Sequence, residues 1–389
     1  MFQILKLNQI SLKGLERFPQ DKYELASEFE HPDAILLRSH QLEASQIAPS
    51  VKAVARAGAG VNNIPISVCT ARGIPVFNTP GANANAVKEL VLAVMLLSSR
   101  GILPGIEYVK TLHEIKDSKK LNELLEKEKN RFRGSELEGK TLGVVGLGAI
   151  GSLVAEIGLS LGMEVLGYDP AISIEAAWKL SRDVRRIENL NTLLSKSHFV
   201  SLHLPVLDST RNMINKTSLK SFKTGAKLFN FAREEIVFTP DLIVALDEKK
   251  LSGYYTDFPT PELIARKEVL LLPHIGASTE EAEENCALLS AKQLVDFLEN
   301  GNVKFSVNFP ETSLDRQGQY RIAITNKNVP KILGKMLSVF ADRNINISDM
   351  LNKSRNEIAY NLIDIDCPPS PEILEELRSI EEVLNVRAL

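Results

Sequence analysis

The feature that most constrains the fold of this chain is a cluster of three glycines between an apolar run and a helical pattern. The run Thr141 to Val145 has the composition of a buried strand, and Gly146, Gly148 and Gly151 follow it directly. A strand, a glycine-rich turn and a helix in this order leave free backbone N–H groups at the positive end of the helix, where they can meet a pyrophosphate. Such a motif is weak when it stands alone, but this context predicts a dinucleotide-binding unit.

An acidic residue stands where the ribose of the dinucleotide is expected. The strand predicted over Glu164 to Tyr168 ends at Asp169, eighteen residues after Gly151. A carboxylate there can accept hydrogen bonds from the ribose hydroxyls, and it repels a 2′-phosphate. We therefore expect NAD rather than NADP as the cofactor. The residues expected to hold it are Gly146, Gly148, Ala149, Ile150, Gly151 and Asp169.

Apolar strand patterns alternate with helical patterns along most of the chain, which predicts parallel sheets because parallel neighbours need a crossover connection. Before the glycine motif the predicted strands are 34–37, 51–55 and 74–77, with a helix over 84–99. After the motif they are 199–202, 227–231, 253–256 and 269–272. A long helix over 279–300 is expected to pack back on the first domain. The charged stretch 107–133 predicts a solvated helix or arm.

The last seventy residues have a different order of elements. Strand, helix, strand, strand, helix and strand follow one another from residue 320, which is the ferredoxin-like arrangement. The predicted fold class is therefore α/β, with two doubly wound Rossmann-like domains and a small C-terminal ferredoxin-like domain. The predicted limits are 1–98 with 275–305 for a substrate-binding domain, 99–274 for the dinucleotide-binding domain, 306–319 for a linker and 320–389 for the C-terminal domain.

Composition excludes several classes of partner. The formal net charge of -3 over 389 residues gives no electrostatic reason to expect nucleic acid or an anionic membrane. The longest apolar stretch, Leu90 to Leu97, is far shorter than the roughly 20 residues of a spanning helix. The three cysteines are far apart and have no metal-site spacing. Because the amino terminus also lacks the pattern of a signal peptide, we expect a cytoplasmic protein without a metal.

Three ionisable residues follow predicted strands in the second domain, namely Arg233, Glu262 and His274. The carboxyl ends of strands in an open α/β sheet face the ligand crevice. Oxidation of an alcohol by NAD needs a base for the hydroxyl proton, and histidine suits because its pKa lies near neutrality. A carboxylate can orient that ring, and an arginine can hold a substrate carboxylate through two hydrogen bonds. Each residue singly has structural uses, but together they predict a hydride-transfer site.

Several motifs, taken in their order along the chain, make this sequence similar to a known family. They are 56–63 (Arg-Ala-Gly-Ala-Gly-Val-Asn-Asn), 78–83 (Asn-Thr-Pro-Gly-Ala-Asn), 146–151 with Asp169, 230–233 (Asn-Phe-Ala-Arg), 256–258 (Thr-Asp-Phe) and 273–279 (Pro-His-Ile-Gly-Ala-Ser-Thr). With these motifs the chain resembles, over essentially its whole length, the D-isomer-specific 2-hydroxyacid dehydrogenase family. Within that family it is similar to members that oxidise 3-phosphoglycerate and carry a C-terminal ACT domain.

The resemblance implies a role for each matching residue. Arg233 corresponds to the substrate-binding arginine, Glu262 to the catalytic carboxylate and His274 to the acid/base histidine. The amides around Ala59 to Val61, with Gly60 between them, are implied to receive the substrate carboxylate. Asp257 is implied to bond the nicotinamide carboxamide. The remaining residues implied to lie at the cofactor are Ala59, Leu204 and Phe231.

A phosphorylated substrate also needs cations away from the redox carbon. Arg38 and Arg56 follow predicted strands of the first domain, and similar arginines in relatives hold a phosphate together with an asparagine at the position of Asn83. The alternative is that both arginines pair with acidic neighbours, since exposed ion pairs are common. Without a phosphate grip the chain would be a glyoxylate or hydroxypyruvate reductase. A third alternative is a catalytically silent NAD-sensing protein.

The sequence departs from the family's pattern at several places, among them the prolines before Glu262, which are rearranged to Pro259-Thr260-Pro261. Glu234 and Glu235 follow the substrate arginine, and we expect them to point outward because a buried unpaired carboxylate is costly. At the first turn of the ACT-like domain, Pro330-Lys331 replaces the usual Pro-Gly. The resemblance implies an effector site for L-serine at Asn326, Asn328 and Asn346. A purely dimerising role of this domain is the alternative, and a homodimer or homotetramer is expected by analogy, with the arm 107–133 reaching toward a partner.

Overall fold

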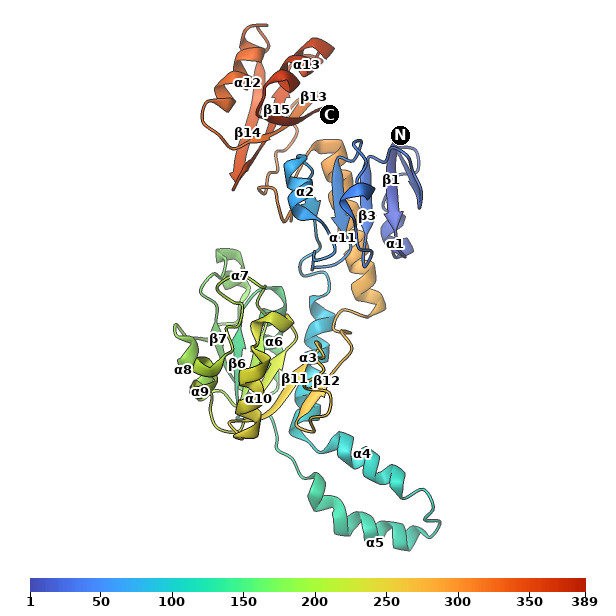
Figure 1. Cartoon of the computed structure of the whole chain (residues 1–389), viewed down its shortest axis with the longest axis vertical. Helices are drawn as coiled ribbons and strands as arrows, with labels where there is room; N and C mark the ends of the chain where they lie inside the picture. Colours follow the sequence, from blue (N-terminus) through green and yellow to red (C-terminus); the bar gives the residue numbers. More distant parts are fainter. The chain divides into compact units, whose positions relative to one another are not determined.

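A computed structural model describes residues 1–389, with the side chain of Glu175 excepted. The chain divides into two units (Figure 1): unit 1 comprises Met1–Asn83 with Thr279–Leu389, and unit 2 comprises Ala84–Ser278. The four-part division predicted from the sequence is finer than this one and stays a prediction.

Unit 1 begins with a parallel sheet of five strands in the order β2-β1-β3-β4-β5, the doubly wound order of flavodoxin-like folds. The strands are β1 Phe2–Leu7, β2 Tyr23–Ala26, β3 Ala34–Leu37, β4 Ala53–Arg56 and β5 Val76–Phe77. The short helices α1 Leu12–Leu15 and α2 Ile66–Ala71 connect them, and α11 Glu280–Asn300 packs against α1 and β4. The predicted return of the long helix to the first domain is thus confirmed.

The C-terminal sheet, β14-β15-β13-β16, is antiparallel and also belongs to unit 1. Its elements are β13 Tyr320–Lys327, α12 Ile332–Ala341, β14 Ile347–Arg355, β15 Ile358–Ile365, α13 Pro371–Ser379 and β16 Val383–Ala388. One face packs on α12 and α13 through Ile322, Ile324 and Ile363. Tyr360 and Leu362, on the other face, share a core with α11. The ferredoxin-like prediction is confirmed. Both faces of the sheet are covered, one by α12 and α13 and the other by α11.

Two arginines of the C-terminal sheet donate hydrogen bonds to carbonyls in the last turn of α11. Arg387 donates to the Phe297 carbonyl at 2.7 Å and lies over the Phe297 ring, 4.2 Å from its centroid. Arg321 donates to the Asn300 carbonyl at 3.0 Å and pairs with Asp364, both side chains being fully buried. Cations are favourable at the negative end of a helix. The sheet and α11 therefore form one continuous body within unit 1.

The segment predicted as a linker contains no helix or strand, but it is held on the first sheet. Val303 and Thr312 bridge each other, and both are fully buried. The Asn308 side chain accepts from the Val76 amide at 2.8 Å and donates to the Ile74 carbonyl at 2.9 Å. These bonds replace the regular structure that the sequence lacks here.

Unit 2 is built on a parallel sheet of seven strands in the order β12-β11-β10-β9-β6-β7-β8. They are β6 Thr141–Val145, β7 Glu164–Tyr168, β8 Arg185–Arg186, β9 Phe199–Leu202, β10 Ala226–Asn230, β11 Leu251–Thr256 and β12 Val269–Leu271. The helices are α3 Ala84–Ser99, α6 Ala149–Ser160, α7 Ile174–Lys179, α8 Leu190–Lys196, α9 Lys216–Ser221 and α10 Thr239–Asp247. This is the Rossmann order with one added strand, so a ligand crevice is expected where the order reverses, between β6 and β9.

The charged stretch forms an arm of two helices, α4 Ile102–Thr111 and α5 Ser118–Glu128, and neither helix contains a buried residue. In Figure 1 the two run as a hairpin away from the sheet of unit 2. The prediction of a solvated arm is confirmed. Over the described residues, no single helix is long and apolar enough to cross a membrane.

Candidate functional site

The glycine turn after β6 forms an open cradle. Gly146 has a φ of +90°, and a Cβ on Gly151 would lie 1.9 Å from the Gly146 carbonyl oxygen, so both positions need glycine. A Cβ on Gly148 would meet nothing within 4 Å. Gly148 is the N-cap residue of α6, and because it has no side chain, it makes no capping hydrogen bond to the first amides of the helix. The first amides of α6, at Ala149 and Ile150, therefore border a space that fits a pyrophosphate.

Asp169 fixes the turn from the end of β7. One carboxylate oxygen accepts from the Leu147 amide at 2.8 Å and the other from the Ala171 amide at 2.9 Å. Each oxygen keeps a lone pair for a ribose hydroxyl. Leu204 borders Gly146, whose added Cβ would lie 2.9 Å from the leucine Cδ2, and Phe231 is buried in the core beneath. These positions suit the expected NAD site.

His203 was not predicted, although it follows β9 at the reversal of strand order. Its Nε2 lies 2.8 Å from the Ser201 hydroxyl, whereas its buried Nδ1 has no partner among the described residues. Burial lowers the pKa of this imidazole to about 3, so the ring is neutral near pH 7. A Cβ added at Gly151 would lie 3.4 Å from the Cβ of His203. His203 therefore lies directly against the glycine turn and supports it. The same strand-end rule that indicated Arg233 and His274 applies to it.

Arg233 is presented by a turn that Asn230 holds together. The fully buried Asn230 side chain donates to the Arg233 carbonyl at 2.8 Å and accepts from the Ala232 amide at 3.2 Å. Arg233 itself is half-buried, while Glu234 and Glu235 are exposed and form no ion pair with it among the described residues. The arginine is therefore open to an anionic substrate, and the two carboxylates do not occupy it.

The loop of His274 is anchored by Asp257. The buried Asp257 carboxylate accepts from the Ile275 amide at 2.8 Å and from the Gly276 amide at 2.6 Å. His274 has a φ of +58°, a left-handed conformation that costs a non-glycine residue about 1 to 2 kcal/mol. Phe258 packs edge-on against the exposed imidazole at 5.1 Å. Such strain persists only where the surroundings impose it, and it is typical of functional sites.

Glu262 lies on an exposed segment after β11. Within the described part of the chain, no hydrogen bond or ion pair joins it to His274. The structure therefore does not join the two groups that the sequence suggested as a proton-transferring pair, and their pairing remains a prediction.

In unit 1, both candidate phosphate-binding arginines already have partners. Arg38, after β3, forms an ion pair with Glu283 of α11, with 2.7 Å between Nη1 and Oε2. Arg56, at the end of β4, donates to the Arg38 carbonyl at 2.9 Å and to the Gly60 carbonyl at 2.6 Å. The alternative prediction was that these arginines pair with acidic neighbours, and Arg38 does so.

The loop after β4 is held by the same contacts. Arg56 bonds Gly60, the Asn78 side chain donates to the Ala59 carbonyl at 2.6 Å, and Val61 is partly exposed. Asn83 carries a buried Oδ1 without a partner among the described residues. A buried polar atom without a partner calls for a water or a ligand, which suits a substrate role for this side chain.

The three candidate effector residues differ in exposure. Asn326 is fully buried, donates to the Lys327 carbonyl at 2.7 Å and accepts from Asn361 at 2.8 Å. Asn328 and Asn346 are exposed, but they lie at opposite ends of the C-terminal sheet, because Lys327 is paired with Ile358 and Ile347 with Ile365. Lys331 occupies a left-handed position with φ +71°, a conformation that glycine adopts at lower cost than lysine. Only the two exposed amides are directly accessible to a small ligand.

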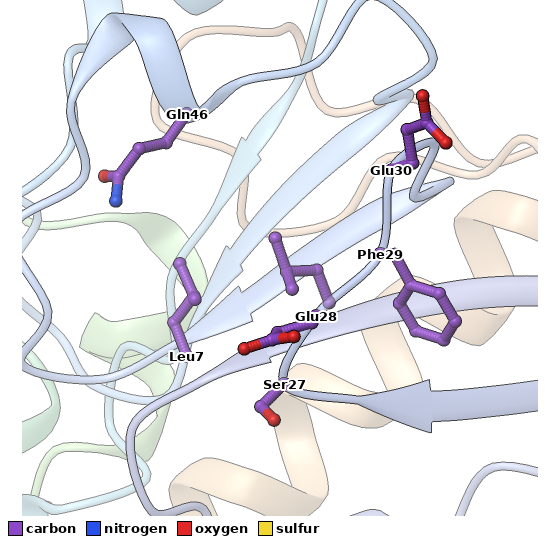
Figure 2. Close-up of a pocket in the computed structure, with 7 residues that line it drawn as sticks. Leu7, Ser27, Glu28, Phe29, Glu30 and Gln46 are labelled. Carbon is purple, nitrogen blue, oxygen red and sulfur yellow. The ribbon is translucent and has the colours of Figure 1, made fainter.

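A separate hollow of about 420 Å³ lies beside β1 in unit 1 (Figure 2). Its lining includes Leu7, Phe29 and the carboxylates Glu28 and Glu30. Two acidic groups without a cation in the lining repel a phosphorylated acid, so we do not assign it to the substrate. Nowhere in the described residues do three or more His, Cys, Asp or Glu side chains form a group that could hold a metal ion.

Comparisons with known proteins agree with this geometry. The model for "D-isomer specific 2-hydroxyacid dehydrogenase, NAD binding domain" matches residues 103–276, and the ACT domain model matches 320–382. The D-3-phosphoglycerate dehydrogenase of Haemophilus influenzae is 34% identical over 89% of this chain and 83% of that protein. D-3-phosphoglycerate dehydrogenase 1 of Saccharomyces cerevisiae is 31% identical over 94% and 80%. The NAD+-bound 3-phosphoglycerate dehydrogenase structure from Entamoeba histolytica superposes with a TM-score of 0.63 at 28% identity, covering 79% of this chain and 98% of that one.

Proposed function

This chain belongs to the D-isomer-specific 2-hydroxyacid dehydrogenase family, and from that membership we propose that it oxidises 3-phospho-D-glycerate to 3-phosphohydroxypyruvate with NAD, the first step of L-serine synthesis. The family's members are NAD-dependent dehydrogenases, and the cradle at Gly148 suits that cofactor. The observation that carries the substrate assignment is the presence of Arg38 and Arg56 at the carboxyl ends of β3 and β4.

In the proposed reaction the cofactor held at the glycine turn would supply a hydride acceptor for the substrate's C2. His274 takes the proton of the 2-hydroxyl, and the Asp257 carboxylate keeps its loop in place through two backbone amides. Arg233 holds the substrate carboxylate and polarises the 2-oxygen, a role for which its planar guanidinium is suited. Glu262 favours the protonated form of the histidine once the proton has moved.

The phosphate end is assigned to unit 1. Arg38 and Arg56 supply the charge, Asn83 supplies an amide, and the backbone amides around Gly60 and Val61 receive the substrate carboxylate. The buried and unpartnered Oδ1 of Asn83 supports this role, since amide side chains can turn to donate through nitrogen.

One observation favours a second candidate function. Arg38 is paired with Glu283, so its charge is not free in the structure as it stands. A glyoxylate or hydroxypyruvate reductase would need no phosphate grip and could keep this pair permanently. The two candidates differ in whether the substrate displaces Glu283 from Arg38.

For regulation and assembly we propose L-serine as an effector at Asn328 and Asn346, and a homo-oligomer that uses the arm of unit 2. Because these two residues lie at opposite ends of the sheet in one chain, a serine that contacts both would bind Asn328 of one copy and Asn346 of another. Ile102, Ile106 and Val109 lie on one face of α4, and their side chains are 40%, 47% and 53% exposed. Contiguous exposed apolar residues of this kind are typical of interfaces. We place the protein in the cytoplasm, where the three free cysteines would stay reduced.

The test is an NADH-coupled assay of the purified chain in both directions, with 3-phosphoglycerate, phosphohydroxypyruvate, glyoxylate and hydroxypyruvate, each with and without L-serine. Turnover of the phosphorylated pair supports the proposal, and inhibition by serine supports the effector site. Reduction of glyoxylate or hydroxypyruvate without turnover of the phosphorylated pair would favour the second candidate. Light scattering on the same sample gives the oligomeric state.

A further inference from the structure

We infer that Glu283 is a specificity-setting residue, an internal competitor that occupies Arg38 until a phosphorylated substrate displaces it. This inference rests on the proposed function for the identity of the substrate. It requires a carboxylate that pairs with Arg38, that can leave, and that is stable in both positions. The three requirements can be examined separately.

The pair is formed by elements held in one unit. Arg38 follows β3, and Glu283 lies in the first turn of α11, which packs on β4 in the same sheet. The distance of 2.7 Å between Nη1 and Oε2 is that of a charge-assisted hydrogen bond. Cys286, one turn further along α11, lies within the field of Arg38, Arg56 and Glu283. The cluster therefore places one carboxylate at the cations assigned to the phosphate.

The pair is also able to open. The side chains of Arg38 and Glu283 are 32% and 42% exposed, so a soluble anion can reach the guanidinium and the carboxylate can turn into water. Arg56 differs, because backbone carbonyls of Arg38 and Gly60 hold its guanidinium and tie it to the loop. The partner of Arg38, a partly exposed carboxylate, can exchange for another anion.

The carboxylate of Glu283 is still stabilised by the protein after it leaves Arg38. It belongs to the acidic first turn of α11, whose N-cap Thr279 accepts from the Ala282 amide at 3.1 Å. Acidic side chains near a helix N-terminus are stabilised by the helix dipole. A phosphate carries more negative charge than one carboxylate and three acceptor oxygens, so it outcompetes Glu283 for the guanidinium. An unphosphorylated 2-hydroxy acid has no group to make this exchange.

The first experiment measures steady-state kinetics of Glu283→Gln, which removes the charge and keeps the shape. Exposed ion pairs contribute modest energies, so we expect the KM for 3-phosphoglycerate to fall by about two- to five-fold with kcat unchanged. The KM for an unphosphorylated D-2-hydroxy acid should not move. The matched control is Glu284→Gln, the same charge change on the next residue of α11, whose carboxylate pairs with Lys13 at 2.7 Å instead.

The second experiment does not depend on the reaction. Inorganic phosphate is titrated into the full chain by calorimetry, for the wild type and for both variants. Tighter phosphate binding by Glu283→Gln alone supports the inference even if 3-phosphoglycerate proves not to be a substrate. Equal phosphate affinity in Glu283→Gln and the wild type overturns it, and so does an equal gain in both variants, which would indicate a general effect of charge.

Discussion

The ligand-facing edges of the two units are organised in different ways. In unit 2 the polar groups at the strand ends are tied by the chain's own hydrogen bonds: Asp169 holds the glycine turn, Asn230 the turn of Arg233, and Asp257 the loop of His274. In unit 1 the corresponding edge carries an arginine, Arg38, whose partner is a half-exposed carboxylate. The cofactor edge is set by backbone geometry, whereas the substrate edge contains a charge that can change partners.

The difference matches what each ligand requires. A pyrophosphate is bound largely by backbone amides, which must be in place before the ligand arrives. A small anionic substrate must be bound and released in every cycle, and an arginine that is neutralised between cycles avoids leaving an uncompensated cation. Two properties can be tested: the rigidity of the cofactor edge of unit 2, called the fixed edge, and the weakness of the exchangeable pair of Arg38 and Glu283 in unit 1.

The largest expected effect is on the chemistry at the fixed edge. His274→Asn removes the imidazole, while asparagine tolerates the left-handed φ of +58° at this position. Loss of a general acid/base lowers turnover by about 10²- to 10⁴-fold. The measurement is kcat for 3-phosphoglycerate oxidation, with NAD affinity by calorimetry as the control, which should stay at the wild-type value. A kcat within tenfold of wild type would remove His274 from the proton transfer.

The next effect compares two ion pairs within unit 1. Arg321 and Asp364 are fully buried, in contrast to Arg38 and Glu283. Arg321→Met leaves the Asp364 carboxylate buried without its cation, which costs about 3 to 5 kcal/mol of stability. The substitution Glu283→Gln should cost less than about 1 kcal/mol. Urea unfolding of the full chain measures both.

A double variant separates charge from packing in that comparison. Arg321→Met with Asp364→Leu replaces both partners by apolar groups, and much of the lost stability should return. If the double variant is no more stable than Arg321→Met, the arginine acts through its bonds to the Asn300 and Leu314 carbonyls rather than through Asp364.

Sequence patterns predicted the buried parts of this fold better than its edges. The strands over 141–145 and 164–168 have the predicted bounds because an apolar run ends at a glycine or an acidic residue. β1 and β2 were not predicted, since Gln3 and Lys6 interrupt the apolar pattern of β1 and β2 is a short edge strand. Such strands are stabilised by pairing with β3 and β1, which no local pattern reveals.

The candidate site divides in the same way. Arg233, His274 and Asp169 were predicted because each follows a strand, and strand ends meet at one edge of a sheet. The pairing of Arg38 with Glu283 was not predicted as a specific contact, because it depends on how α11 returns to unit 1. The role of Asn230 was also missed, since a buried amide that holds a turn has no sequence signature beyond its position in the motif.

Two glycines of the cofactor turn give a third, intermediate effect. In Gly151→Ala the added Cβ would lie 1.9 Å from the Gly146 carbonyl oxygen, so the turn must shift and both thermal stability and NAD affinity should fall. In Gly148→Ala the Cβ meets no protein atom within 4 Å and enters the space assigned to the pyrophosphate. We expect an unchanged Tm and a roughly tenfold loss of NAD affinity, about 1.4 kcal/mol. Unchanged NAD affinity in Gly148→Ala would mean that the cradle is not at this amide.

The last effect concerns acid stability of the fixed edge, and it vanishes at neutral pH. Burial lowers the pKa of His203 to about 3 from an ordinary value of 6.5, so between these values the unfolded chain binds a proton that the folded chain does not. Stability contributed by this group is therefore fully present above about pH 6.5 and falls as the pH drops, by about 1.4 kcal/mol per pH unit. His203→Asn should remove this slope while keeping a polar group near Ser201.

The readout for His203 is the difference between two curves, because carboxylates elsewhere titrate in the same range. Urea midpoints of wild type and His203→Asn are compared from pH 4.5 to 7.5. The gap between them should be constant above pH 7 and shrink or reverse toward pH 4.5, since only the wild type must bury a base that prefers to be protonated. Parallel curves over the whole range would mean that water reaches the ring, and the support beneath the glycine turn would then be less rigid than the bond between Ser201 and His203 indicates.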